Sequence, residues 1–330
     1  MTTNLAPYEA LQIVKEISFG TQKVTPVAGV DSIYIRLAGA NRFTMRPIPT
    51  DRDIPFGGGF DVPGYTVSDQ VLVTGNLSLE LCYSQASMLL NWCATRINGA
   101  QTLPWPTTEP IGDLDSCTIY HLIARSDDGT YKRTRYKGVK VGNWKLAASA
   151  QSGLVMLDMG LQAQKWDGNA IEATADPDAT AFPVPPDTAF PTDPLLFYQS
   201  TTTAAGSALT YVQGITIDVN NAMDARFFTG ATAGRFIGLN RIRGRKSTAS
   251  LDLIYTATPN WRPKLEAITS EALSFAFSNS VNTVTVDFKA NNLIKSLSDA
   301  LAPGKLYDQT VSYTNQYDTA SSLDLAFTFA

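Results

Sequence analysis

The chain has 330 residues, of which 44% are hydrophobic and 17% charged, so it is long and apolar enough to bury a core and lies outside the range of disordered chains. This length predicts about two domains. The net charge of -4 lacks the basic surplus of proteins that bind nucleic acid tightly.

Most of the chain is predicted to form strands, because β-branched or alternating apolar residues recur between Gly, Asn, Asp and Ser. Residues 118–125 and 130–141 form a hairpin around Ser126–Gly129, where Asp-Gly suits a tight turn. The fold class is therefore mainly β. The predicted strands are Ser32–Leu37, Gln70–Tyr83, Cys117–Arg125, Leu154–Gln164, Gly214–Asn220, Thr283–Lys289 and Leu323–Phe329.

Two segments have the apolar spacing of amphipathic helices. The first is Ser84–Ile97, with Ser84 as its N-cap. The second follows Thr258 and Pro259 and places apolar residues at helical spacing from Trp261 to Ala272. We expect each helix to lie across a sheet.

An internal repeat indicates duplication of a strand–helix–strands unit. Ser78–Tyr83 recurs 172 residues later as Ser250–Tyr255, and both copies lead into the predicted helices. The matching order predicts Leu293–Leu301 to be a strand, although its local pattern is helical. The other correspondences are Asp31–Tyr34 with Gly214–Ile217 and Trp144–Gln162 with Ile294–Asn315.

A segment rich in proline and aspartate, Glu172–Pro194, separates the two copies. Proline disfavours helix interiors and central strands, so this segment is predicted to be an extended linker on the surface. We therefore divide the chain into residues 1–195, the first half with an N-terminal arm and this linker, and residues 196–330, the second half.

Charge is strongly segregated along the chain. Trp166–Asp224 contains eight acidic residues and no Lys or Arg, whereas Ala225–Leu251 contains six basic residues and no acid. A second basic block lies at Lys132–Lys145. Opposed blocks suit self-association between complementary faces, although solvated loops would also carry such charges.

Features that would support catalysis, metal binding or membrane insertion are weak. His121 is the only histidine and lies in an apolar strand, so we interpret it as a core residue. Gly57–Gly59 lacks the residues of a phosphate-binding loop. The three cysteines are predicted to be buried thiols: Cys82, Cys93 and Cys117. From these weak features we expect no enzyme activity, no cofactor and no metal. Because the sequence has no long apolar segment and no signal-like start, we expect neither membrane insertion nor secretion.

Several short motifs resemble those of tailed-bacteriophage tail tube (major tail) proteins. The opening Ile13–Thr21, followed by Thr25–Pro26 and Asp31–Ile33, is similar to the stretch before their first strand. Val212–Asn221, the following basic loop and Ser250–Tyr255 extend the resemblance. It implies a β-sandwich or barrel-like fold, with subunits in six-fold or pseudo-six-fold rings that stack into the tail tube.

The resemblance further implies that inner sheets join edge to edge around a lumen. A duplicated chain could build the ring from three copies, and six copies remain an alternative. The implied partners are the chain itself, with tape-measure, tail-terminator and baseplate or tail-tip proteins, and a sheath if the tail is contractile. DNA would be a transient cargo. The expected location is the virion tail, after assembly in the bacterial cytoplasm.

Two long loops, Thr50–Gly64 and Arg226–Lys246, are candidates for contacts between stacked rings. We expect the basic blocks to face subunit contacts rather than the lumen, since a basic wall would retain DNA. A β-sandwich module that binds carbohydrate or protein, and a β-rich enzyme, are the alternatives. The candidate contact residues are Arg52, Asp53, Phe56, Phe60, Arg226, Arg235, Arg241, Arg243, Arg245 and Lys246.

Overall fold

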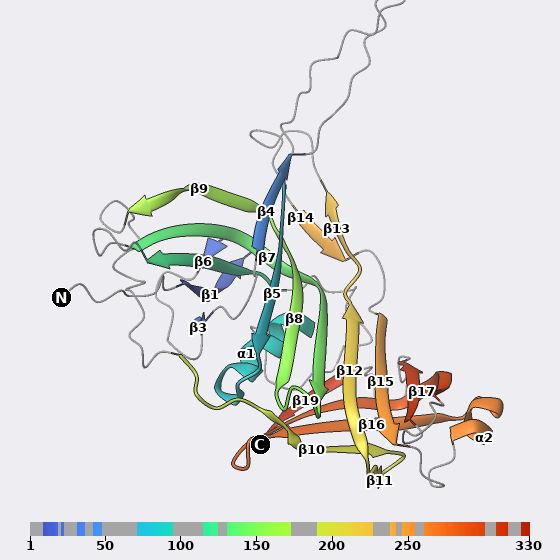
Figure 1. The fold of residues 1–330 in the computed structure, drawn as a ribbon. Coiled ribbons are helices and arrows are strands. Elements are labelled where there is room, and N and C mark those ends of the chain that lie inside the picture. The colour runs from blue at the N-terminus through green and yellow to red at the C-terminus, as the bar shows by residue number, and fades with distance from the viewer. Residues whose placement is uncertain are drawn as a thin grey trace, which may run out of the picture.

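The computed structural model of the chain is mainly β (Figure 1). It describes residues 9–18, 21–22, 32–36, 42–47, 71–94, 115–124, 131–172, 190–226, 238–241, 246–254, 261–300, 308–315 and 325–330.

The first part of the chain contributes nine strands and one helix to the described structure. These are β1 (Glu9–Ser18), β2 (Thr21–Gln22), β3 (Ser32–Arg36), β4 (Arg42–Pro47), β5 (Val71–Glu80), α1 (Tyr83–Ala94), β6 (Cys117–Ala124), β7 (Tyr131–Ser149), β8 (Val155–Ala163) and β9 (Lys165–Glu172). The second part contributes β10 (Leu196–Ala204), β11 (Ser207–Ala208), β12 (Val212–Asn220), β13 (Met223–Arg226), β14 (Gly238–Arg241), β15 (Lys246–Ile254), α2 (Trp261–Glu266), β16 (Ser270–Ser278), β17 (Thr283–Ala300), β18 (Asp308–Thr314) and β19 (Leu325–Phe329).

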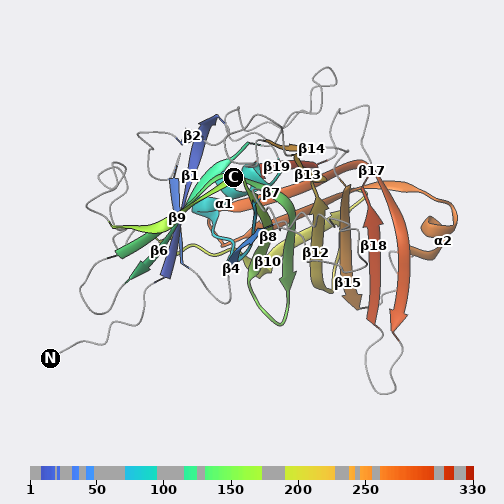
Figure 2. The same ribbon diagram turned by 90° about the horizontal axis from the view of Figure 1, so that it is seen from above.

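Eight antiparallel strands form a central sheet in the order β4-β5-β8-β7-β12-β15-β18-β17. Alternating burial gives this sheet one core face and one open face, as in β8, where every second residue is buried. Figure 2 shows the strands from β8 to β17 side by side across the sheet.

A second layer covers the core face. Its two parts are β3-β1-β6-β7-β9 and β11-β10-β16-β17-β19. Strands β7 and β17 are 19 and 18 residues long, so each passes from this outer layer into the central sheet. Gly138 has a φ of 63° where β7 makes this transition, a conformation that glycine adopts without steric cost.

The apolar core extends through both parts of the chain. The main cluster includes Trp92 on α1, Trp144 on β7 and Phe275 on β16, all with at most 1% exposure. Trp144 contacts Phe327 of β19 with ring centroids 6.2 Å apart. The two parts therefore bury their apolar faces against each other.

The same strand pairing occurs twice. Ser78 on β5 pairs with Asp158 on β8, which pairs with Lys145 on β7. In the same way, Ser250 on β15 pairs with Ser312 on β18, which pairs with Ser296 on β17. In addition, β6 pairs with β1 and β7 as β16 pairs with β10 and β17. The expected element order is confirmed, including the strand at Leu293–Ala300.

The upstream part of the predicted repeat is wrong. Strand β3, which contains Ile33, pairs with β1, whereas β12 pairs with β15. The strand beside β5, in the place that β12 has beside β15, is β4. Short apolar strands look alike in sequence, and only their pairing partners distinguish them.

Both predicted helices needed correction. Helix α1 starts at Tyr83, so Ser84 lies in its first turn, and the Asp193 carboxylate accepts hydrogen bonds from Ser84 N at 2.9 Å and Ser84 Oγ at 2.8 Å. Helix α2 has six residues, and Ile268, with a φ of 51°, follows its end and is 73% exposed. Pairing of β16 with both β10 and β17 makes the following residues a strand.

At the end of the proline-rich segment, residues 191–194 are partly or fully exposed, whereas Phe190 is buried. Directly after the segment, Leu195 is buried and its N donates to Leu81 O at 2.9 Å. Residues 173–189 lie outside the described residues.

The predicted burial is confirmed for the cysteines but not for the histidine. All three cysteines are buried and free, as predicted, whereas His121 is half-buried in β6 rather than enclosed in the core. The predicted β6–β7 hairpin is confirmed, and its turn lies outside the described residues.

Candidate subunit-contact surfaces

The central sheet joins the two parts of the chain through antiparallel pairing of β7 with β12. The register runs from Ser149 opposite Gly214 to Asn143 opposite Asn220, and we call this joint the internal seam. Exposed Lys145 and Asp218 lie directly opposite each other in it. Opposite charges on facing residues favour this register.

Asn221 stabilises the end of the internal seam. Its side chain is fully buried, and Nδ2 donates to Cys93 O at 2.7 Å and to Val141 O at 2.9 Å. Its backbone N donates to Gly142 O at 2.9 Å. One residue after β12 is thus bound to both α1 and β7.

The two ends of the central sheet are strand edges. Within the described residues, β4 pairs only with β5, and Ile294–Ala300 of β17 pair only with β18. Ser296 and Ser298 on this part of β17 are exposed. Figure 2 shows the lower part of β17 beside β18 at one end of the sheet. An edge of this kind presents backbone donors and acceptors that can pair with another chain.

Among the side chains that the structure describes on the open face of the central sheet, short polar ones dominate and the charged ones are mainly acidic. A shallow hollow crosses β5, β8, β7, β12 and β15, lined among others by Ser78, Ala147 and Thr216. None of the described side chains on this face is aromatic. The charged residues that alternate with buried ones here are Glu80, Asp158, Asp218, Asp252 and Asp308, against Lys145 and Lys246.

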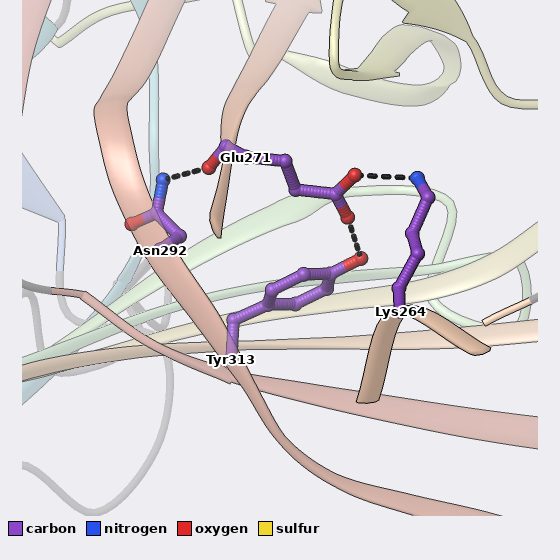
Figure 3. Close-up of polar contacts among 4 residues, drawn as sticks. All are labelled: Lys264, Glu271, Asn292 and Tyr313. Atoms are coloured by element: carbon purple, nitrogen blue, oxygen red, sulfur yellow. Dashed lines mark hydrogen bonds and ion pairs between the residues drawn. The ribbon is translucent and has the colours of Figure 1, made fainter. Parts of the chain in front are cut away.

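A buried carboxylate supports the edge strand β17 from within (Figure 3). Glu271 on β16 accepts hydrogen bonds from Lys264 Nζ at 2.6 Å and from Tyr313 OH at 2.8 Å. Its backbone O accepts from Asn292 Nδ2 at 2.8 Å. Burial first, and then the charge of Glu271, raise the pKa of Tyr313. The cluster links α2, β16, β17 and β18.

A second buried carboxylate, that of Glu16, binds neighbouring segments together in the first part of the chain. Glu16 on β1 accepts from Ser116 Oγ at 2.5 Å, Thr118 Oγ1 at 2.7 Å and Gly138 N at 2.8 Å. Hydrogen bonds to a charged acceptor are stronger than neutral ones. This carboxylate therefore fixes the point where β7 enters the central sheet.

The structure places only some of the candidate contact residues. Arg226 is the last residue of β13 and Arg241 the last of β14, so both belong to one two-stranded ribbon. Lys246 begins β15, is exposed and lies opposite Asn220. Figure 1 shows the β13–β14 ribbon and the upper end of β4–β5 at the same end of the molecule. The remaining candidates lie outside the described residues: Arg52, Asp53, Phe56, Phe60, Arg235, Arg243 and Arg245.

Sequence reasoning missed the edge strands, the role of Asn221 and an exposed apolar pair. Tyr198 is 72% and Val281 84% exposed, and Gln199 Nε2 donates to Ser280 Oγ at 2.5 Å beside them. The Asn220–Asn221 dipeptide was a visible signal, but only the structure gives its partners. Edges carry no sequence signal of their own, because pairing depends on the neighbouring strand.

The described residues offer neither a metal site nor a membrane-spanning helix. No group of three or more His, Cys, Asp or Glu residues in this part of the chain is placed to hold a metal ion. Neither of its two helices has the length and apolarity that crossing a bilayer requires.

Comparison with protein families is decisive for the assignment. A family model described as phage tail tube protein matches residues 9–329. The chain belongs to the phage tail tube protein family. A search of curated proteins found no match.

Membership in the tail tube family confirms the resemblance seen in the short motifs. The match includes both series of strands, from β1 to β19. The chain is therefore a structural component of a phage virion tail with a mainly-β sandwich fold, and the family role implies association with itself and with other tail components.

Proposed function

We propose that this chain is the ring-forming subunit of a phage tail tube, and that DNA is ejected through the stacked rings. The central sheet is the observation that carries this proposal. One of its faces is covered by the outer layer, the other is open and polar, and each end has an unpaired edge within the described strands. A closed ring of such sheets removes both edges.

The chemistry of the open face supports its place on the lumen wall. On the described part of this face, short polar side chains and a surplus of carboxylates would repel DNA phosphates weakly instead of binding them. Lys145 and Lys246 also lie on this face. The expectation that the basic blocks lie away from the lumen therefore applies only to their arginines.

Ring stacking would use the two long segments named from the sequence, Thr50–Gly64 and Arg226–Lys246. Residues 50–64 follow β4, and the β13–β14 ribbon carries Arg226 and Arg241. The other candidate contacts named from the sequence belong to the same two loops. The six basic residues of Ala225–Leu251, with no acid among them, suit an acidic surface on the next ring.

We also propose the division into residues 1–195 and 196–330. The repeated pairing order supports two halves of related topology, each with one helix. Tape-measure, tail-terminator and baseplate or tail-tip proteins are the proposed partners, with a sheath in a contractile tail. Assembly would take place in the host cytoplasm.

The role we propose is structural and not enzymatic. A carbohydrate- or protein-binding module would need a concave aromatic patch, whereas the open face has no aromatic side chain among the described residues. The β-sandwich binding module is therefore the less favoured function.

Electron microscopy of the purified, untagged protein over a range of concentrations tests this proposal. Assembly buries subunit interfaces only on polymerisation, so rings or hollow tubes should increase with concentration. Assembled tubes should bind little duplex DNA even at low salt. A protein that stays monomeric at every concentration, or tubes that retain DNA with a steep salt dependence, would contradict it.

A further inference from the structure

Ile268, which follows the end of α2, combines two features that each cost free energy. Its φ of 51° lies in the left-handed region, and its side chain is 73% exposed. A β-branched residue in this region is a steric outlier, because the side chain crowds the backbone. Among the described residues other than glycine with positive φ, Ile268 is the only β-branched one. The fold thus keeps an apolar side chain in water at a strained position.

The hydrogen bonds at the helix end hold Ile268 in this conformation. Thr269 N donates to Lys264 O at 3.0 Å, and Ile268 N donates to Leu265 O at 3.2 Å. This is the Schellman pattern of helix ends, in which glycine or asparagine usually has the place of Ile268. The Lys264 side chain binds the buried Glu271 at 2.6 Å. The end of α2 is therefore fixed to β16, and the position of Ile268 with it.

The first helix shows what the end of α2 is placed to contact. At the repeat distance of 172 residues, Cys93 near the end of α1 corresponds to Leu265 near the end of α2. Cys93 O accepts a hydrogen bond from Asn221 Nδ2, and Asn221 belongs to the next repeated unit. The end of α1 is therefore bound to the following unit beside the internal seam.

The end of α2 has no following unit in the described part of the chain. Residues 266–270 are all exposed. Figure 2 shows α2 at one end of the molecule, beyond β17 and β18. Ile268 lies three residues after Leu265, so its side chain is exposed where the first half of the chain meets its neighbour.

We propose that Ile268 is an apolar anchor for a second copy of the chain, which covers the end of α2 as the second unit covers the end of α1. This proposal rests on the ring-forming function above and adds a helix-end contact to it. Strained residues persist where the surrounding structure fixes them and where they serve a function. Glycine or asparagine at this position would relieve the backbone but would bury no large apolar side chain on association.

Two variants of Ile268 separate its effects on folding and on assembly. Ile268→Asn accepts the left-handed conformation, so urea unfolding of the unassembled protein should show a folded-to-unfolded ratio about three- to fivefold higher than wild type. The same variant should need at least about tenfold more protein to form rings in electron micrographs, because the apolar contact is lost. Ile268→Val keeps a β-branched apolar side chain and should stay within about fivefold of wild type in ring formation.

Ala205→Asn controls for the relief of strain alone. Ala205 has a φ of 50° in the turn between β10 and β11, and it is exposed. The Ala205→Asn variant should therefore stabilise the fold without changing ring formation. If Ala205→Asn impaired ring formation as much as Ile268→Asn, relief of strain would explain both results and the inference would be overturned.

The Ile268→Cys variant reports the contact directly. The three native cysteines are buried, so a thiol reagent should label only the introduced thiol in the unassembled protein. Assembled rings should lose this labelling. Rings labelled as fast as the unassembled protein, or unchanged ring formation by Ile268→Asn, would overturn the inference and leave the ring-forming function intact. Lower stability of Ile268→Asn would contradict the strain assigned to Ile268. A wild-type protein that forms no ring would contradict both the inference and the function.

Discussion

Replacing Asn221 should destabilise the fold more than replacing other asparagines. The Asn221→Ala variant loses both donations from Nδ2, to Cys93 O and Val141 O, and leaves these carbonyls in a fully buried site. A hydrogen bond contributes ~1 kcal/mol net, and an unsatisfied buried group costs ~1–3 kcal/mol. We expect a loss of about 2–4 kcal/mol in the free energy of unfolding.

Urea unfolding at a protein concentration too low for assembly measures this loss, with fluorescence of the buried Trp92 and Trp144 as the signal. Asn221→Asp should cost more than Asn221→Ala, because a carboxylate would face two carbonyl oxygens without a donor. The control is Asn76→Ala at an exposed site on β5, which should stay within ~0.5 kcal/mol of wild type. An Asn221→Ala variant as stable as this control would refute the role assigned to the amide.

Three further predictions concern the capping contact, the buried tyrosine and the thiols. Asp193→Ala should cost ~1 kcal/mol through loss of the contacts to Ser84, and Asp193→Asn should restore most of it; equal losses in urea unfolding would argue against capping. Because burial and Glu271 raise the pKa of Tyr313 above 10.0, this hydroxyl stabilises the fold fully below pH 10, and the contribution is lost as the pH rises further. Tyr313→Phe should therefore cost ~1.5–3 kcal/mol at pH 7, and the difference from wild type should shrink above pH 10; unfolding curves with a constant difference would be inconsistent with this linkage. Burial raises the pKa of Cys82 from 9.0 to about 11 and also raises the pKa values of Cys93 and Cys117, so a disulfide reagent at pH 8 should label the thiols only after unfolding, and rapid labelling of the folded protein would be the contrary result.

Local pattern located several of the strands, but it missed β1 and β16 and failed for the second helix. Residues 261–272 have helical spacing, yet the helix ends at Glu266 and Ser270 begins a strand. Pairing on both sides of β16 supplies backbone hydrogen bonds over nine residues, and this outweighs the weak helix propensity of the segment.

The candidate contacts illustrate the same limit. Clusters of arginine pointed to loops, whereas the edges of the central sheet are made of residues such as Ser296 that have no distinctive chemistry. An edge exists only because a neighbouring strand is missing, and that depends on the whole sheet.

By itself, the sequence determined the mainly-β class, the duplicated order of elements, the buried thiols and the resemblance to tail tube proteins, because alternation and repetition are local properties of the chain. Only the tertiary structure decided that β4, not β3, stands beside β5, that β7 and β12 join the two parts into one sheet, and that Asn221 and Asp193 bind distant elements. These features depend on hydrogen bonds between residues far apart in the chain, whose partners local sequence patterns do not specify.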